Sequence, residues 1–451
     1  MSESERGTRS YASGARMLSV GIASTGVLTF AYFAIASHVL GTSTVDRSRY
    51  DSIAELWSVM FVIICVIYRP IEQLLSRTIA ERRARGIHRH PMRVPMSIQG
   101  SFALVFLAIA LPLHRTLANG VFHSVTLYWI LVVGILAYAA SYFARGWLAG
   151  HKYFALYGGL VFMESASRLA FALVAAVGIS HGQSAIALGI AAAPFVSLVV
   201  VPAAFASRAQ RSDPPASFAD AALEGPAAEG IEEAASDLGI RLGARFAFSV
   251  SGIQLAEQTL LNAAVLTVAA TTAADRGLTG AVFDLLLITR APLQLFQAIQ
   301  TSLLPHLAGL EVTEGHAAFS RAIRVIVLAI AGFSLAVALG LLAVGPFAMH
   351  HVFRYNYPYN RFGLALIALG MGLHLCAGAL NQAALARGQA GRAAALWLLA
   401  AALFVGWMLL GVVADQVLRT ELGYAAAAGL LALALTALYR RGSPTASASA
   451  V

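Results

Sequence analysis

Long apolar stretches alternate with short polar segments along almost the whole chain. Twelve of these stretches approach the roughly 20 residues that a helix needs to cross the hydrocarbon core of a membrane. None shows the strict alternation of apolar and polar residues that is typical of membrane β-strands. The pattern therefore predicts an all-α integral membrane protein with about 12 transmembrane helices. The helices are expected to begin near Met17, Ile53, Val94, Val125, Tyr153, Gln183, Leu242, Leu278, Arg324, Phe362, Arg392 and Leu422.

The composition supports this interpretation. The chain is 59% hydrophobic and only 12% charged, whereas soluble domains are about 45–50% apolar and about 25% charged. The net charge of +9 would favour nucleic acid as a partner of a soluble protein, but here it reflects arginines in loops between membrane helices. Both cysteines, Cys65 and Cys376, lie inside apolar runs. They form no disulfide framework and no metal-binding spacing, so neither a metal nor a cofactor is expected.

The arginines also predict the orientation. If the N-terminus is cytoplasmic, the inner segments carry 20 Arg and Lys residues and the outer loops carry 7. Positive charge accumulates on the cytoplasmic side of membrane proteins, so both termini are expected inside. The first apolar run, from Met17, is longer than the roughly 7–15 residues of a signal-peptide core, so we expect it to be retained as a helix.

A polar segment rich in Ala, Pro and acidic residues divides the chain into two halves. The two halves have weakly similar sequences at corresponding positions: "RPIEQLLSRTIAERRARG" starts at Arg69 and "RAPLQLFQAIQTSLLPHLAG" starts at Arg290. This pattern favours two lobes related by a pseudo-two-fold axis along the membrane normal. The predicted division is a cytoplasmic tail over 1–16, a first lobe over 17–207, a linker over 208–240, a second lobe over 241–441 and a cytoplasmic tail over 442–451.

Polar side chains recur at helical spacing within the predicted seventh helix. A charge at the centre of a membrane helix costs about 2.5–3.5 kcal/mol on insertion scales, so such residues need partners, water or a function. Three- and four-residue steps place the group on one face. We expect this face to line a cavity; the alternative is hydrogen bonding between helices. The group comprises Gln254, Glu257, Gln258 and Asn262, with Arg245 nearer the cytoplasm.

The predicted eighth and second helices carry similar polar faces. In the eighth, Arg290, Gln294 and Gln297 follow one another at helical spacing, and Asp284 lies nearer the outer end. Arg290 is a candidate for binding phosphate, because the planar guanidinium binds two phosphate oxygens at once. The alternative is that Arg290 pairs with Asp284 or Glu257.

In the second helix, Arg69, Glu72 and Gln73 lie close to one another around Pro70. A proline interrupts the hydrogen-bond ladder of a helix. In a membrane the freed carbonyls are tolerated only beside protein or water. We therefore expect this helix end to form one wall at the cytoplasmic mouth of a cavity.

Glu164 and Arg168 lie four residues apart in the predicted fifth helix. This spacing and order favour an ion pair on one helix face. The structural interpretation is a self-neutralised pair, and the functional one is a proton or cation site. Glu164, Arg168, Glu257 and Asp284 are the candidates for coupling transport to H⁺ or Na⁺.

Two segments resemble the multidrug/oligosaccharidyl-lipid/polysaccharide exporter superfamily, in particular its bacterial polysaccharide flippase branch. "ARGWLAGHKYFALYGGLVFMESASRLA", from Ala144, resembles the family's fourth and fifth helices, and "TRAPLQLFQAIQTSLLPHLA", from Thr289, resembles its eighth. The resemblance implies alternating access between two six-helix lobes of a protein in the bacterial cytoplasmic membrane, moving lipid-linked sugars to the outer leaflet. The first helix has no Arg or Lys after Arg16. Members that flip peptidoglycan precursors carry cations there, so that substrate is not favoured.

The sequence carries no nucleotide-binding loop and no arrangement of nucleophile and base, so neither ATP-driven transport nor an enzyme is expected. The leading hypothesis is a flippase for oligosaccharides linked to polyprenyl phosphate or diphosphate. The partners are then membrane lipid, the lipid-linked sugar and glycosyltransferases or a polymerase of the same pathway. The alternatives are a cation-coupled small-molecule antiporter of the same superfamily and a transport-dead scaffold for cell-envelope enzymes.

Overall fold

The computed structural model describes residues 24–40, 44–84, 93–120, 124–151, 153–179, 182–199, 226–271, 277–288, 315–353 and 357–441, with a few single residues between them. These residues are almost entirely helical. Nine helices within the described ranges are long and apolar enough to cross a membrane, and three shorter apolar helices accompany them. Together they account for the 12 predicted segments and confirm an all-α, multipass membrane fold.

The bounds of the helices follow the predicted starts closely, with the largest extensions at polar ends. The three short apolar helices are Ser24–Leu40, Gln183–Ser197 (α6) and Leu278–Ile288. The long helices are α2 (Thr44–Ala84), α3 (Arg93–Gly120), α4 (Val125–Gly150), α5 (Phe154–Ala176), α9 (Pro226–Thr271), α11 (Gly315–Val352), α12 (Arg361–Ala386), α13 (Ala390–Leu410) and α14 (Gln416–Arg441).

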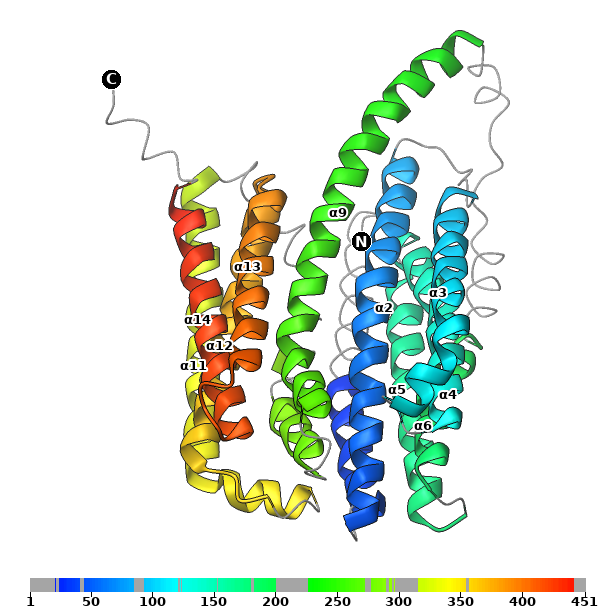
Figure 1. Ribbon diagram of the computed structural model, residues 1–451. Helices are drawn as coiled ribbons and strands as arrows, with labels where there is room; N and C mark the ends of the chain where they lie inside the picture. Colours follow the sequence, from blue (N-terminus) through cyan, green and yellow to red (C-terminus); the bar gives the residue numbers. More distant parts are fainter. Residues whose placement is uncertain are drawn as a thin grey trace, which may run out of the picture.

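The helices form two groups that meet along α2 and α9 (Figure 1). In the first group α4 packs against α2, α3 and α6, and α5 packs against α6. In the second group α12 packs against α11 and α14, while α13 packs against α9 and α14. Because α2 and α9 come from different halves of the sequence, their contact is the main described boundary between the two lobes.

The predicted linker overlaps the beginning of α9. This helix starts at Pro226, so residues 226–240 are helical and continuous with the seventh membrane span. Residues 208–225 lie outside the described part of the chain. The division of the chain at 208–240 therefore stays a prediction, with helical structure now assigned to its second part.

Local sequence determines where several helices begin and end. Ser124 precedes α4, and its hydroxyl accepts a hydrogen bond from the amide of Leu127. Asp415 accepts hydrogen bonds from the first amides of α14. These side chains satisfy amides that have no partner within the helix. Gly411 ends α13 with a φ of 65°, a left-handed conformation that glycine adopts without steric cost.

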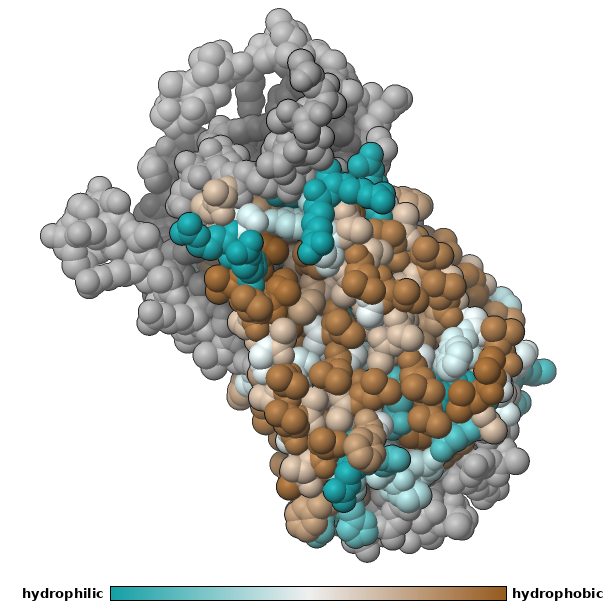
Figure 2. All heavy atoms as spheres, turned by 90° about the vertical axis from the view of Figure 1, so that its left-hand side faces the viewer, coloured by the Kyte–Doolittle hydropathy of each residue, from teal (hydrophilic) through white to brown (hydrophobic). Residues whose placement is uncertain are grey.

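The outer faces of the bundle are apolar. Figure 2 looks at the side formed by α11, α12 and α14 and shows a broad hydrophobic band between more polar ends. Large aliphatic side chains of α11 are exposed there, including Val325, Leu328, Leu335, Leu339 and Val344. Such a surface would be a liability in water. Contact with lipid accounts for it, as the hydrophobic pattern predicted.

Glycine brings α4 and α2 into close contact beside the polar core of the first lobe. A Cβ atom added at Gly146 would lie 2.8 Å from the carbonyl oxygen of Glu72 and 3.3 Å from Cβ of Leu75. Because part of this contact is backbone, a side-chain rotation does not relieve it.

We therefore expect Gly146→Ala to push the two helices apart and to lower stability by about 1–3 kcal/mol, the usual cost of overpacking. Thermal unfolding of the purified protein measures the effect. Gly159→Ala is the matched control, because a Cβ atom there has nothing within 4 Å. Alanine also favours a helix over glycine by up to about 1 kcal/mol, so an equal or larger loss in the control would contradict the packing explanation.

Candidate functional site

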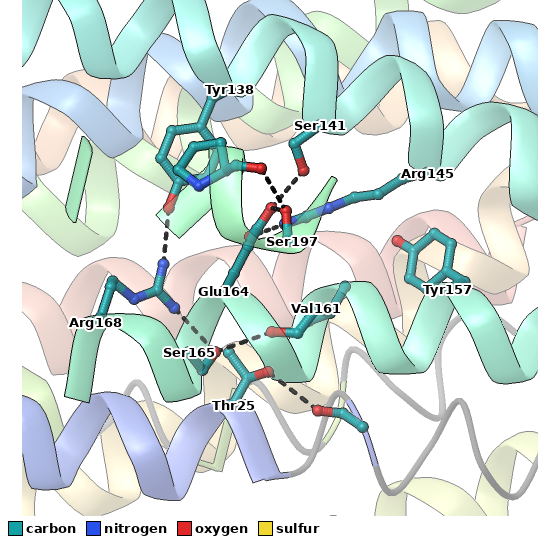
Figure 3. Close-up of polar contacts among 12 residues, drawn as sticks. Thr25, Tyr138, Ser141, Arg145, Tyr157, Val161, Glu164, Ser165, Arg168 and Ser197 are labelled. Carbon is teal, nitrogen blue, oxygen red and sulfur yellow. Dashed lines mark hydrogen bonds and ion pairs between the residues drawn. The ribbon is translucent and has the colours of Figure 1, made fainter. Parts of the chain in front are cut away.

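A carboxylate lies at the centre of a polar cluster inside the first lobe (Figure 3). Glu164 of α5 is only 2% exposed. It forms an ion pair with Arg145 of α4 and accepts a hydrogen bond from Ser141 of the same helix. The hydroxyl of Ser197, at the end of α6, lies 3.3 Å from the same carboxylate and 2.8 Å from the carbonyl oxygen of Pro194, so these two acceptors share its one proton. Two donors, a shared third and one full positive charge satisfy the Glu164 carboxylate within the protein.

Arg168 points to a different set of partners. Its guanidinium donates hydrogen bonds to the Tyr138 hydroxyl at 2.8 Å and to the Ser165 hydroxyl at 3.0 Å. It also lies 5.3 Å from the ring of Trp57, within the range of a cation–π interaction. The predicted ion pair between Glu164 and Arg168 is therefore wrong. Arg145 from the neighbouring helix takes that place, and aromatic groups accommodate Arg168.

The sequence did not indicate this role of Arg145. Arg145 is one of the 20 Arg and Lys residues that the charge pattern assigns to cytoplasmic segments, whereas α4 continues past it to Gly150. The continuation of apolar residues after it, "GWLAG", was the signal that it lies within the membrane helix. Its guanidinium also lies 4.4 Å from the Tyr142 ring.

A second polar contact joins the two lobes. Arg69 of α2 donates a hydrogen bond to the side-chain oxygen of Gln254 of α9 at 3.2 Å. The amide nitrogen of Gln254 donates in turn to Glu257 at 3.2 Å. Arg69 also lies within the electrostatic field of Glu257 and Glu72. The sequence had placed all four residues at a cavity, and the structure brings them together between α2 and α9.

The interlobe contact and the first-lobe cluster join through Glu72. Glu72 accepts a hydrogen bond from the Tyr157 hydroxyl at 2.6 Å and acts electrostatically on Arg145. Five side chains thus form a series in which negative and positive charges alternate. We call it the charge chain: Glu257, Arg69, Glu72, Arg145 and Glu164. Alternating sign gives each charge an opposite neighbour, which a low-dielectric interior requires.

The other predicted site residues differ in their surroundings. Gln258 and Asn262 are buried, and Asn262 donates to the backbone and side chain of Gln258, at 2.9 and 3.2 Å. Gln73 is exposed. The side chain of Arg245 and residues Arg290, Gln294 and Gln297 lie outside the described part, and their roles stay predictions.

A separate contact joins the lobes at the end predicted to be outer. Asp284 accepts a hydrogen bond from the Tyr50 hydroxyl of α2 at 2.5 Å. Asp51, also in α2, accepts hydrogen bonds from the amides of Gly277 and Gly280, at 2.7 and 2.8 Å. Sequence spacing singled out Asp284 but gave no indication of Tyr50 or Asp51. Their partners are more than 200 positions away along the chain.

Among the described residues, no three His, Cys, Asp or Glu side chains gather in a way that could hold a metal ion. The charged groups of the site instead form ion pairs and hydrogen bonds with one another. The arrangement is suited to binding charge and to exchanging one ion pair for another.

Comparisons with known proteins identify the fold. No protein-family model matches the sequence, and no curated protein matches it. Solved structures match over nearly the whole chain. An outward-facing multidrug resistance MATE transporter of the MOP superfamily is 13% identical, with 95% of this chain and 94% of that chain covered and a TM-score of 0.68.

Two further matches have similar extents. A MATE transporter from Vibrio cholerae is 15% identical, with 96% and 97% of the two chains covered and a TM-score of 0.63. A MOP superfamily transporter from Pyrococcus furiosus, described as having a binding pocket of reverse polarity that suggests a different function, is 13% identical, with 95% of each chain covered and a TM-score of 0.66. These structural neighbours are transporters. The chain is therefore a multipass membrane protein with a MATE-like fold.

Proposed function

We propose that this chain is a transporter that flips an oligosaccharide linked to polyprenyl phosphate or diphosphate across the bacterial cytoplasmic membrane by alternating access. The observation that carries the proposal is Arg69, an arginine at the lobe boundary that donates a hydrogen bond to the neutral amide of Gln254 and lies near the negative charge of Glu257, both in the other lobe. A guanidinium binds phosphate oxygens in pairs and more strongly than it binds an amide. An anionic headgroup is therefore expected to displace Gln254 as the hydrogen-bond partner of Arg69.

The charge chain supports an exchange of partners during transport. A phosphate at Arg69 would compete with Gln254 and with the nearby negative charge of Glu257. Separating α2 from α9 would then require less free energy, because contacts of the incoming anion with Arg69 replace those that Arg69 loses. The sugar would occupy the polar space opened between the lobes, and the polyprenyl tail would stay in lipid.

The surroundings of Glu164 weigh against the cation-antiporter alternative. A carboxylate that binds a transported cation or proton needs a free coordination position. Glu164 already has Arg145, Ser141 and Ser197 as partners. If transport is coupled to H⁺ or Na⁺, we expect the coupling group to be Glu257 or Asp284, at the lobe boundary.

Transport can be tested with the purified protein in liposomes that contain a fluorescent polyprenyl-diphosphate-linked sugar. Leaflet transfer is measured by quenching of the fluorophore from outside. We expect transfer to be at least tenfold faster than in protein-free liposomes. If several different lipid-linked sugars move no faster than in protein-free liposomes while organic cations are exported, the antiporter is the better proposal. If neither class moves, the transport-dead scaffold for cell-envelope enzymes is the better proposal.

A further inference from the structure

The outer contact between the lobes contains a buried carboxylate with one unsatisfied oxygen. Asp284 is fully buried in the helix Leu278–Ile288. One of its oxygens accepts the hydrogen bond from Tyr50, and the other has no hydrogen-bond partner among the described residues. Burying an ionised carboxylate that accepts one hydrogen bond costs much more free energy than burying the protonated acid.

The neighbouring charges increase this cost. The charged side chain that acts on Asp284, among the described residues, is a second carboxylate, Asp51. Glu55, one turn further along α2, lies close to Asp51. From the second lobe, Tyr359 approaches and donates its hydroxyl to the carbonyl of Ala281. The arginines at this end of α2 and α12 have exposed side chains: Arg49 and Arg361.

Asp51 itself is well suited to remain ionised. Its two oxygens accept hydrogen bonds from the backbone amides of Gly277 and Gly280, at the start of the helix that carries Asp284. A helix N-terminus carries partial positive charge and stabilises an anion. Two carboxylates thus share one buried contact. In the described part of the chain, both oxygens of Asp51 accept a hydrogen bond, as an ionised group needs, whereas Asp284 has a donor at one oxygen.

We propose that Asp284 is a proton-binding site, and that the proton it holds keeps the two lobes together at their outer end. When the lobes separate there, water reaches Asp284 and the acid can ionise. Loss of the proton then disfavours closure, because closing would bury a charge beside Asp51. The site rests on the proposed rocking of the lobes but not on the identity of the transported molecule.

The test measures the distance between the outer ends of the lobes as a function of pH. Cys65 and Cys376 are first replaced by serine. Spin labels are then attached through Val125→Cys and Phe362→Cys, at two exposed positions that start α4 and follow the start of α12. Double electron–electron resonance is recorded in lipid nanodiscs between pH 5 and pH 9. No substrate is needed, so a wrong assignment of the substrate does not affect the result.

We expect the short distance to dominate at low pH and a longer one to gain population as the pH rises. Asp284→Asn mimics the protonated acid and should keep the short distance at every pH. The matched control is Asp415→Asn, at the same end of the second lobe. Asparagine caps a helix as well as aspartate does, so this variant should keep the pH dependence of the background protein.

A second variant preserves Asp284 and removes only its donor. Tyr50→Phe removes a hydrogen bond that joins the lobes in the closed state, so the closed form loses stability and the opening midpoint should fall by up to about one pH unit, while the pH dependence itself is retained. The proposal is overturned if the background protein shows no pH dependence, if Asp284→Asn retains it, or if Tyr50→Phe abolishes it.

Discussion

Replacing Arg145 by methionine is expected to destabilise the protein by about 3–5 kcal/mol, the cost of leaving one member of a buried ion pair without its partner. Glu164 is buried, and Arg145 supplies the positive charge of its ion pair. Methionine retains much of the volume of the arginine stem, so the loss is mainly electrostatic. Unfolding in mixed micelles, followed by tryptophan fluorescence, measures the change.

A second substitution separates the ion pair from the packing around it. In the double variant Arg145→Met/Glu164→Gln the buried charge is removed together with its partner, and a neutral amide can still accept from Ser141 and Ser197. We expect this variant to recover most of the lost stability, because replacing both members of a buried pair is often close to neutral. Arg321→Met, at an exposed position of α11, should have little effect. A double variant no more stable than Arg145→Met would argue against the ion pair as the cause.

The membrane helices could be predicted because their signal is local. A run of apolar residues forms a helix in lipid whatever its neighbours are, since every backbone group must be satisfied within the segment. The predicted starts at Val125, Gln183 and Leu278 coincide with the observed ones. Differences arise where polar residues extend a helix beyond the lipid, as in α9, which begins at Pro226 and not near Leu242.

Polar residues could be grouped from the sequence where they lie on one helix, because helical spacing shows which of them share a face. Contacts between different helices could not be predicted in this way. The polar face of α9 could be recognised by its spacing, and the structure brings Gln254 and Glu257 to Arg69. Spacing alone misassigned Glu164, because several helices compete to supply its partner. The contact of Asp51 with Gly277 depends on how the lobes meet, and no periodicity within one helix contains that information.

Replacing Arg69 by glutamine is expected to slow leaflet transfer of a lipid-linked oligosaccharide by at least tenfold. Glutamine can still donate to Gln254, so the contact between α2 and α9 need not be lost. It cannot supply positive charge or a bidentate fork for phosphate. Arg69→Lys keeps the charge without the fork and should give an intermediate rate. Initial rates of transfer in liposomes, at matched protein content, measure both variants.

Replacing Glu257, which lies near Arg69 in the other lobe, is expected to change ligand binding in the opposite direction from Arg69→Gln. Glu257→Gln removes the negative charge that lies near Arg69 in the absence of substrate. A phosphate then competes with one negative charge fewer for Arg69, so binding of a soluble diphosphate-sugar should become tighter. Arg69→Gln should weaken this binding.

Arg324→Gln, exposed on α11, is the matched control and should leave binding and transfer unchanged. If Arg69→Gln and Arg324→Gln reduce transfer equally, the loss reflects general surface charge and not a phosphate site. If Glu257→Gln weakens binding as much as Arg69→Gln does, Glu257 contacts the ligand itself and the proposed competition for Arg69 is wrong.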